Sequence, residues 1–368
     1  MTVGPVIRVS CSPGEWRVAV LEADGVLLDY AIDRPGRPDG VGDMLRGRVT
    51  AHVPAMSGAF VALPNAEGFL PDSAGAAGLG VGDAVRVRIT RAAQGGKGPR
   101  LTIDGAADPG PPALLTRGPG AALRLAALHP GLPVLVDDPA IAALWRGTLG
   151  DRLSPGGFDD ATEAQVDALA GPHVALPLGM TATISPTPAL VAIDVDLGAA
   201  TAGRVAKAPV QRDANRAAIP ALARQIRLRN LGGAIVIDLA GMPIRRRATL
   251  APDFVSALAS DPLQPRFLGF SALGLAEILR PRIHPPLHAL LAGPHAAGLC
   301  ALRQLDRDCA GDPATPRHIV AAPDVHRALA DDAVAAADVA RRTGRPLSVR
   351  SDPTLAPGTA RVEWDVHG

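Results

Sequence analysis

At 368 residues the chain is long enough for two to four domains, and 47% hydrophobic residues can build their cores although only 3% are aromatic. A formal net charge of +1 excludes a global basic field for nucleic acid, so any such surface must be a local patch. Three cysteines without a C-x-x-C pair indicate neither a disulfide framework nor a standard zinc site, and the lack of a signal peptide or long apolar span predicts a cytoplasmic protein without an integral membrane segment.

The first part of the chain predicts β structure. Short apolar runs at 6–10, 16–21 and 26–30, separated by turn residues, predict a three-stranded meander. Five further runs between residues 47 and 102 are also separated by turn residues. This is the ordering of a small OB-fold barrel of the S1 RNA-binding type.

The predicted barrel contains candidate RNA-binding side chains. Phe60 and Phe69 both lie in predicted barrel strands, and exposed aromatic rings in such strands stack on bases. Cations that follow the RNA backbone are supplied by a further group: Arg86, Arg88, Arg91, Lys97 and Arg100. The alternative, in which both phenylalanines belong to the barrel core, stays open from the residues alone.

The segment after the barrel changes composition. Residues 105–119 are rich in Pro and Gly and predict a linker, which is followed by a helix, a strand and two helices at 121–127, 133–137, 139–152 and 160–169. Asp137 and Asp138 precede Pro139, and an aspartate before a helix-starting proline usually caps the helix. We therefore interpret Asp138 as an N-cap rather than a catalytic residue.

Two apolar runs further along the chain each end in an aspartate. Residues 190–196 (Leu-Val-Ala-Ile-Asp-Val-Asp) and 234–238 (Ala-Ile-Val-Ile-Asp) predict buried strands, with a helix over about 215–230 between them. The period of two puts Asp194 and Asp196 on one face, and the strand–helix–strand crossover lets Asp194 and Asp238 lie side by side. A hairpin at 173–177 and 181–185 leads into the first strand.

Converging carboxylates repel each other unless a cation neutralises them. Mg²⁺ favours one or two carboxylates together with water and phosphate oxygens, so this pattern indicates phosphate chemistry. Arg245 and Arg247, just after the second strand, are placed to hold phosphates. The alternatives are aspartates that cap turns or pair with arginines, and an arginine run that is only solvated.

The remaining chain predicts a small α/β unit. Its expected helices lie near 299–306 and 324–342, and its expected strands at 318–322, 347–350 and 361–364.

Three ordered motifs carry a resemblance to a known family. The runs 190–196, 224–238 and 274–282 resemble the catalytic core of the ribonuclease E/G family of bacterial endoribonucleases. The resemblance implies an α/β multidomain fold with an RNase H-like domain over 1–36 and 105–172. It also implies an inserted S1-type OB-fold barrel over 37–104, a DNase I-like domain over 173–292 and a small C-terminal α/β domain over 293–368.

The resemblance also implies an activity. It makes the chain a Mg²⁺-dependent endoribonuclease that cleaves single-stranded RNA by attack of a metal-activated water, leaving 5′-phosphate and 3′-hydroxyl ends. Asp194 and Asp238 fall on the family's metal-binding aspartates. Asp196 stands where the family carries an asparagine, so it keeps an oxygen as a further ligand of the metal but adds negative charge. The resemblance also implies that Phe60, Phe69 and Lys97 contact RNA, because they match RNA-contacting residues of the family.

Departures from the family keep an alternative open. Asp196 and the run 240–242 (Ala-Gly-Met), where an acidic residue is common, leave a catalytically weak or inactive RNA-binding protein as the second reading. The stretch 292–300 has one cysteine, Cys300, where the family often has Cys-Pro-x-Cys, so a homo-oligomer is possible but not through a zinc link. The family's Val-Arg-Thr motif for a 5′-monophosphate has no match; Thr116-Arg117 is a reversed pair.

Overall fold

The computed structural model describes residues 4–106, 109–198, 208–312, 315 and 317–364. Contacts within the chain divide it into two compact units, each assembled from separate segments. Unit 1 comprises Met1–Pro38, Gly120–Ala170 and Leu287–Gly368, whereas unit 2 comprises Asp39–Pro119 and Gly171–Pro286. The predicted mixture of helices and strands is confirmed.

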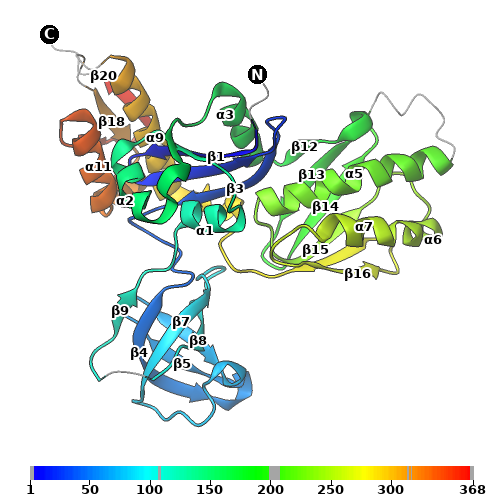
Figure 1. The fold of residues 1–368 in the computed structure, drawn as a ribbon, viewed down its shortest axis with the longest axis horizontal. Helices are drawn as coiled ribbons and strands as arrows, with labels where there is room; N and C mark the ends of the chain where they lie inside the picture. The colour runs from blue at the N-terminus through cyan, green and yellow to red at the C-terminus, as the bar shows by residue number, and fades with distance from the viewer. Residues whose placement is uncertain (1–3, 107–108, 199–207, 313–314, 316, 365–368) are drawn as a thin grey trace. The chain divides into compact units, whose positions relative to one another are not determined.

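Unit 1 is built around a five-stranded sheet with the order β11-β10-β1-β2-β3 (Figure 1). The predicted meander is confirmed, because β1, β2 and β3 pair antiparallel in chain order, while β10 and β11 extend the sheet in parallel. Ile7 and Val18 of this sheet pack with Leu125 and Trp145 of its helices into one core. The elements are β1 (Val6–Ser12), β2 (Glu15–Leu21), β3 (Leu27–Asp33), α1 (Ala121–Leu128), β10 (Val134–Val136), α2 (Pro139–Leu149), η3 (Gly150–Arg152), β11 (Leu153–Pro155), α3 (Asp160–Asp167) and η4 (Ala168–Ala170).

Asp138 caps helix α2, as the proline after it predicts. Its carboxylate accepts a hydrogen bond from the backbone N–H of Ala140 at 2.9 Å and pairs with Arg341 at 2.6 Å and Arg342 at 2.7 Å. Burial by itself raises the pKa of Asp138, but the hydrogen bonds from Arg341 and Ala140 outweigh it and hold that pKa below its usual value. This carboxylate therefore serves the fold of unit 1.

The C-terminal part of unit 1 has a three-stranded sheet with the order β19-β18-β20, against which helices pack. The prediction of one helix over 324–342 is wrong, because the Asp332 carboxylate accepts a hydrogen bond from the Ala335 N–H and caps a second helix. The helix expected near 299–306 extends further in both directions. The elements are α8 (Leu287–Leu290), α9 (Gly293–Gly311), β18 (Arg317–Ala321), α10 (Pro323–Ala330), α11 (Ala333–Thr343), β19 (Val349–Ser351) and β20 (Ala360–Trp364).

Unit 2 contains the predicted OB-like barrel. Five strands close on themselves in the order β5-β6-β8-β7-β4, because β5 also pairs with β4 (Figure 1). A strand at 113–116 corrects the expected linker: this segment pairs antiparallel with β4 and adds a sixth strand. Val49, Val61, Leu70, Val87 and Leu101 fill the barrel interior. The elements are β4 (Met44–Val53), η1 (Pro54–Met56), β5 (Gly58–Ala62), β6 (Glu67–Pro71), η2 (Asp72–Ala74), β7 (Ala84–Arg91), β8 (Arg100–Ile103) and β9 (Ala113–Thr116).

The rest of unit 2 is a six-stranded sheet with the order β12-β13-β14-β15-β17-β16. Strands β14 and β15 are parallel, as the crossover predicts, and the other neighbours are antiparallel. The helix predicted over 215–230 begins earlier, near residue 208. The elements are β12 (His173–Ala175), η5 (Pro177–Gly179), β13 (Thr181–Pro186), β14 (Leu190–Asp196), α5 (Ala208–Leu228), β15 (Gly233–Asp238), α6 (Ile244–Arg247), η6 (Ala248–Leu250), α7 (Ala251–Leu258), β16 (Arg266–Phe270) and β17 (Ala276–Arg280).

Only one face of this sheet carries the core. Ile193 and Ile235 point to the side where α5 and α7 contribute Leu222 and Phe254, and all four side chains are buried in one cluster (Figure 1). Because side chains alternate along a strand, the intervening residues occupy the opposite face. We call this opposite face of β12 to β15 the open face. It carries apolar side chains such as Val236 and, toward the carboxyl ends of β14 and β15, the polar side chains of the predicted site.

Candidate functional site

Asp194 and Asp238 are neighbours on the open face. The register of the parallel strands β14 and β15 pairs Asp194 directly with Asp238, and adjacent strands lie about 4.8 Å apart. Both side chains are exposed, and 54% of the Asp238 side chain is accessible. The prediction that two strand ends bring these aspartates side by side is confirmed, whereas their metal-binding role stays a prediction.

Asp196 lies on the same face but further along β14. Its neighbour across the ladder is Thr181 of β13, whereas β15 ends level with Asp194. Within the described part of the chain no three His, Cys, Asp or Glu side chains converge closely enough to hold a metal ion. Asp194 and Asp238 are therefore the carboxylates that lie close together. The predicted role of Asp196 as a further metal ligand has no support from the geometry.

Arg247 is placed differently from the expectation that it holds phosphate. Its side chain is only 10% exposed, and its Nη1 donates to Asp238 Oδ1 at 2.7 Å and to the Gly274 carbonyl at 2.9 Å. Its Nε and Nη2 donate to the carbonyls of Met242 and Leu239. With these donors engaged, the guanidinium orients Asp238 and the loop after β15 instead of facing solvent.

Arg245, the other predicted phosphate ligand, is exposed on helix α6. It therefore keeps the access to solvent that contact with phosphate requires.

Asn215 is a positioning residue that the sequence pattern did not single out. It is fully buried on α5, its side-chain amide donates to the Ala240 carbonyl at 2.9 Å, and its carbonyl accepts from the Ala240 N–H at 3.2 Å. This pair of bonds ties the helix to the backbone two residues after Asp238. The available signal was a polar residue on the apolar stripe that includes Ile219 and Leu222.

The barrel aromatics lie outside the barrel core. Phe60 and Phe69 are direct cross-strand neighbours on β5 and β6, and their rings meet edge to face with centroids 5.6 Å apart. Both are half-buried, while Ala59, Val61 and Leu70, which alternate with them, are buried. Their placement on the outer surface disfavours the core alternative.

Two exposed cations, Lys97 and Arg100, lie in and just after the turn that leads into β8. Lys97 is exposed in the turn bridged by Gln94 and Lys97, where Gly95 and Gly96 have positive φ of 60° and 72°. Arg100 is exposed and is paired in register with Phe69. An aromatic pair with an exposed arginine on the adjacent strand is suited to a single-stranded nucleic acid.

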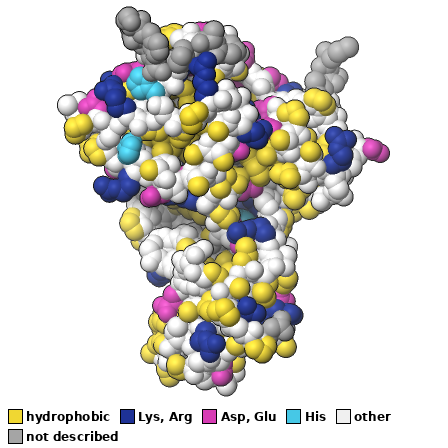
Figure 2. All heavy atoms as spheres, turned by 90° about the vertical axis from the view of Figure 1, so that its left-hand side faces the viewer, with side chains coloured by type: hydrophobic (Ala, Val, Ile, Leu, Met, Phe, Trp, Pro, Cys, Tyr) yellow, Lys and Arg dark blue, Asp and Glu magenta, His cyan; other side chains and the backbone are white. Residues whose placement is uncertain are grey.

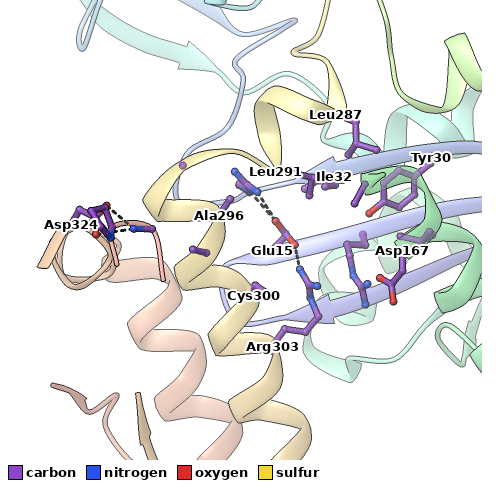
Figure 3. Close-up of a pocket in the computed structure, with 18 residues that line it drawn as sticks. Glu15, Tyr30, Ile32, Asp167, Leu287, Leu291, Ala296, Cys300, Arg303 and Asp324 are labelled. Carbon is purple, nitrogen blue, oxygen red and sulfur yellow. Dashed lines mark hydrogen bonds and ion pairs between the residues drawn. The ribbon is translucent and has the colours of Figure 1, made fainter. Parts of the chain in front are cut away.

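Unit 1 has a pocket of about 640 Å³, shown in Figure 3. Its wall includes Glu15, which is buried and pairs with Arg34 at 2.8 Å and Arg303 at 2.5 Å. Arg17, also in the wall, pairs with Glu163 at 2.7 Å. These charged side chains of the pocket wall are therefore paired within unit 1.

Surface charge is mixed, as the net charge predicts. On the face that Figure 2 shows, Lys and Arg side chains lie among Asp and Glu side chains without forming one large basic field. Within the described ranges, no helix has the length and apolar character needed to cross a membrane.

Comparison with known proteins identifies the segment that contains the aspartate pair. A sequence model of the ribonuclease E/G family matches residues 159–283. This segment belongs to the ribonuclease E/G family. The resemblance drawn from the three motifs is thus confirmed over the matched residues, which include β14 and β15 with both aspartates.

Individual ribonucleases align with the same part of the chain. Ribonuclease E of Nostoc sp. is 39% identical over 112 residues, which are 30% of this chain and 16% of that protein. Ribonuclease E of Escherichia coli is 35% identical over 126 residues, 34% of this chain and 12% of that protein. Ribonuclease G of Escherichia coli is 36% identical over 109 residues, 29% of this chain and 22% of that protein.

The alignments therefore cover between 12% and 22% of these relatives. The barrel precedes the segment that matches the family model. The case for Phe60, Phe69 and Lys97 accordingly depends on their placement in the barrel.

Proposed function

We propose that this protein is a Mg²⁺-dependent endoribonuclease that cleaves single-stranded RNA and leaves 5′-phosphate and 3′-hydroxyl ends. The observation that carries the proposal is the register of Asp194 with Asp238 on an exposed sheet face, inside the segment that matches the ribonuclease E/G family. Relatives named ribonuclease E and ribonuclease G support RNA as the substrate.

The donor set of the aspartate pair fits Mg²⁺. Two exposed carboxylates provide the oxygen ligands that Mg²⁺ takes from proteins when water and phosphate complete its shell. The side chain of Asp194 makes no hydrogen bond or ion pair with another described residue. Only Oδ1 of Asp238 is bonded to Arg247, so its Oδ2 remains available. When bound, Mg²⁺ supplies activation of a water nucleophile and compensation of charge on the phosphate.

The remaining residues position the aspartates and the RNA. Arg247 holds Asp238 through one carboxylate oxygen, and Asn215 fixes the backbone that follows it. The barrel binds the strand through Phe60 and Phe69. We assign Arg245, which is exposed, to the flanking phosphates.

A direct assay tests the activity. A labelled AU-rich single strand is incubated with the full chain in Mg²⁺ and, in parallel, in excess EDTA. We expect internal cleavage with Mg²⁺ only, and products whose ends accept ligation as a 5′-phosphate and a 3′-hydroxyl. Intact RNA in Mg²⁺ contradicts the proposed activity, and equal cleavage in EDTA contradicts the role of the metal.

The strand order of the two α/β parts supports specific fold assignments. We assign the five-stranded sheet of unit 1 to the RNase H-like class, because an antiparallel meander is extended in parallel by β10 and β11. We assign the six-stranded sheet of unit 2 to the DNase I-like class and the barrel to the S1 type. These three assignments are the ones that the ribonuclease E/G resemblance implies.

The barrel surface yields a first prediction. Phe60→Ala and Phe69→Ala should each weaken RNA binding by about 1–3 kcal/mol, because each loses one base stack. The midpoint of thermal unfolding should change little, since both rings lie outside the core cluster. Fluorescence anisotropy with labelled RNA and a melting curve measure the two effects; loss of folded protein would instead place the rings in the core.

Lys97 provides a matched electrostatic test. RNA affinity falls with salt concentration, and the slope of this dependence reflects the number of phosphate contacts. Lys97→Ala should reduce the slope by the amount expected for about one contact, whereas Lys97→Arg should retain the wild-type slope. An unchanged slope in Lys97→Ala would remove this lysine from the RNA path.

A further prediction concerns the 5′ end of the RNA. The segment between the barrel and α1 contains Thr116-Arg117 but no Val-Arg-Thr motif, and Arg117 pairs with Asp43 at 2.5 Å. A 5′-monophosphate therefore gains no specific contact there, and 5′-monophosphorylated and 5′-hydroxyl forms of one RNA should be cut at nearly equal rates. A preference of tenfold or more, about 1.4 kcal/mol, would reveal a recognition site elsewhere.

The second candidate function is an RNA-binding protein with little or no turnover. The departures at Asp196 and at residues 240–242 favour it, together with the lack of a three-residue metal cluster in the described ranges. RNA affinity with intact RNA after long incubation in Mg²⁺ would select this candidate.

A further inference from the structure

A row of four side chains crosses the open face of the six-stranded sheet. The register aligns His173 of β12 with Thr183 of β13, Thr183 with Asp194 of β14, and Asp194 with Asp238 of β15. Neither His173 nor Thr183 belongs to the buried cluster beneath the sheet, and His173, Asp194 and Asp238 are exposed. We propose that His173 is a catalytic residue, the general acid that protonates the leaving 3′ oxygen of the cleaved RNA; this inference rests on the proposed endoribonuclease function.

The spacing of the row matches this role. Adjacent strands are about 4.8 Å apart, so the backbone at His173 lies two strands, or about 10 Å, from that at Asp194. Side chains on one face project the same way, and Thr183 between them is short. A phosphodiester above Thr183 can therefore face the carboxylate pair on one side and the imidazole on the other.

The contact between His173 and Thr183 orients the imidazole ring of His173. Nδ1 of His173 lies 3.3 Å from Oγ1 of Thr183. Nε2 has no partner among the described residues. In the imidazolium form both ring nitrogens carry a proton, so Nδ1–H donates to the Thr183 hydroxyl oxygen and Nε2–H is the proton that can be transferred.

The chemistry of the neighbouring groups singles out His173. Facing groups across the ladder are Thr181 and Thr183 on β13 and, beyond them, Asp194 and Asp196 on β14. On the side of α5, Arg229 donates to the carbonyl of Gly171 at 3.1 Å, two residues before His173. Ionised carboxylates lack a proton to give and an arginine retains its own, whereas histidine exchanges a proton near neutral pH.

The reaction balances with water as the co-reactant. The water oxygen forms a bond to phosphorus, and the bond from phosphorus to the 3′ oxygen breaks. The proton on His173 Nε2 passes to that 3′ oxygen, which leaves as a hydroxyl, and the proton lost by the attacking water goes to solvent. His173 regains its proton from solvent, and the products carry 5′-phosphate and 3′-hydroxyl ends.

Substrates with oxygen or sulfur at the leaving position test the assignment. A thiolate leaves without protonation, so an RNA with a bridging 3′ sulfur at the cleavage site bypasses the acid. His173→Gln should cleave the oxygen substrate about 10²-fold or more slowly than the wild type, but the sulfur substrate within about threefold of it. His326→Gln, a change on helix α10 of unit 1, should match the wild type on both substrates.

The pH dependence gives an independent readout. The wild-type rate on the oxygen substrate should decline on the alkaline side as the imidazolium is lost, and His173→Gln should lack that decline. RNA affinity of His173→Gln, measured with the uncleaved strand in EDTA, should equal that of the wild type.

Each contrary result has its own meaning. An equal defect on both substrates, or none on the oxygen substrate, overturns the role of His173 while the endoribonuclease proposal stands. If the wild type cuts neither substrate, the proposed function fails and the role of His173 falls with it.

Discussion

Asp194→Asn and Asp238→Asn should each lower the rate of RNA cleavage by about 10³-fold, roughly 4 kcal/mol of transition-state stabilisation. An amide is a neutral and weaker ligand than a carboxylate, so the site loses both affinity for the cation and charge complementarity. RNA affinity should stay close to that of the wild type, because the barrel makes its contacts elsewhere. Single-turnover cleavage and anisotropy binding measure the two quantities.

Asp196→Asn is the matched control. Asp196 lies on the same face of the same strand, but its neighbour across the ladder is Thr181 and not the second aspartate. This change restores the asparagine that the family resemblance expects, so activity should be retained. Full activity in either Asp194→Asn or Asp238→Asn would remove the aspartate pair as the centre of the reaction.

Arg247→Met should affect stability and catalysis together. Three carbonyl groups, of Leu239, Met242 and Gly274, lose their donor, and each buried acceptor left without a partner costs about 1–3 kcal/mol. Without Arg247 the carboxylate of Asp238 is no longer held in position. The cleavage rate should therefore fall by about 10–100-fold, the range found when residues that orient metal ligands are lost. Urea unfolding and single-turnover cleavage measure these effects.

Arg245→Met separates positioning from contact with RNA. Arg245 is exposed, so its replacement should leave stability unchanged and flatten the salt dependence of RNA affinity. Arg247→Met should keep the wild-type salt dependence in the folded protein. A flattened dependence in Arg247→Met, without loss of stability, would show that Arg247 contacts phosphate directly.

Local patterns were sufficient for most of the strands, for the barrel and for the position of the aspartates. Residues 190–196 and 234–238 are apolar runs that each end in an aspartate, and the glycines at 232 and 233 separate helix α5 from the apolar run of the second strand. The N-cap at Asp138 was equally local, because the capped N–H groups lie within three residues. These features depend on side-chain period and on backbone conformation, both of which act over a few residues.

Other features depended on elements that meet only in the folded chain. The segment 113–116 looks like part of a linker until its partner strand β4 supplies hydrogen bonds to it. The sequence pattern is helical on both sides of Asp332, so it did not reveal that one helix ends and another begins there. The N-cap at Asp332 becomes visible only in the structure, where α10 and α11 are separate helices.

The sequence by itself determined that two aspartates lie near the ends of neighbouring parallel strands and that an OB-like barrel precedes them. Only the tertiary structure decided that Arg247 turns inward to Asp238, that Asn215 clamps the loop after it, and that His173 lines up with both aspartates. Strand register and the burial of long polar side chains are set by partners far away in sequence. No local pattern encodes them, because the hydrogen bonds that select them form only when the strands pair and the helices pack.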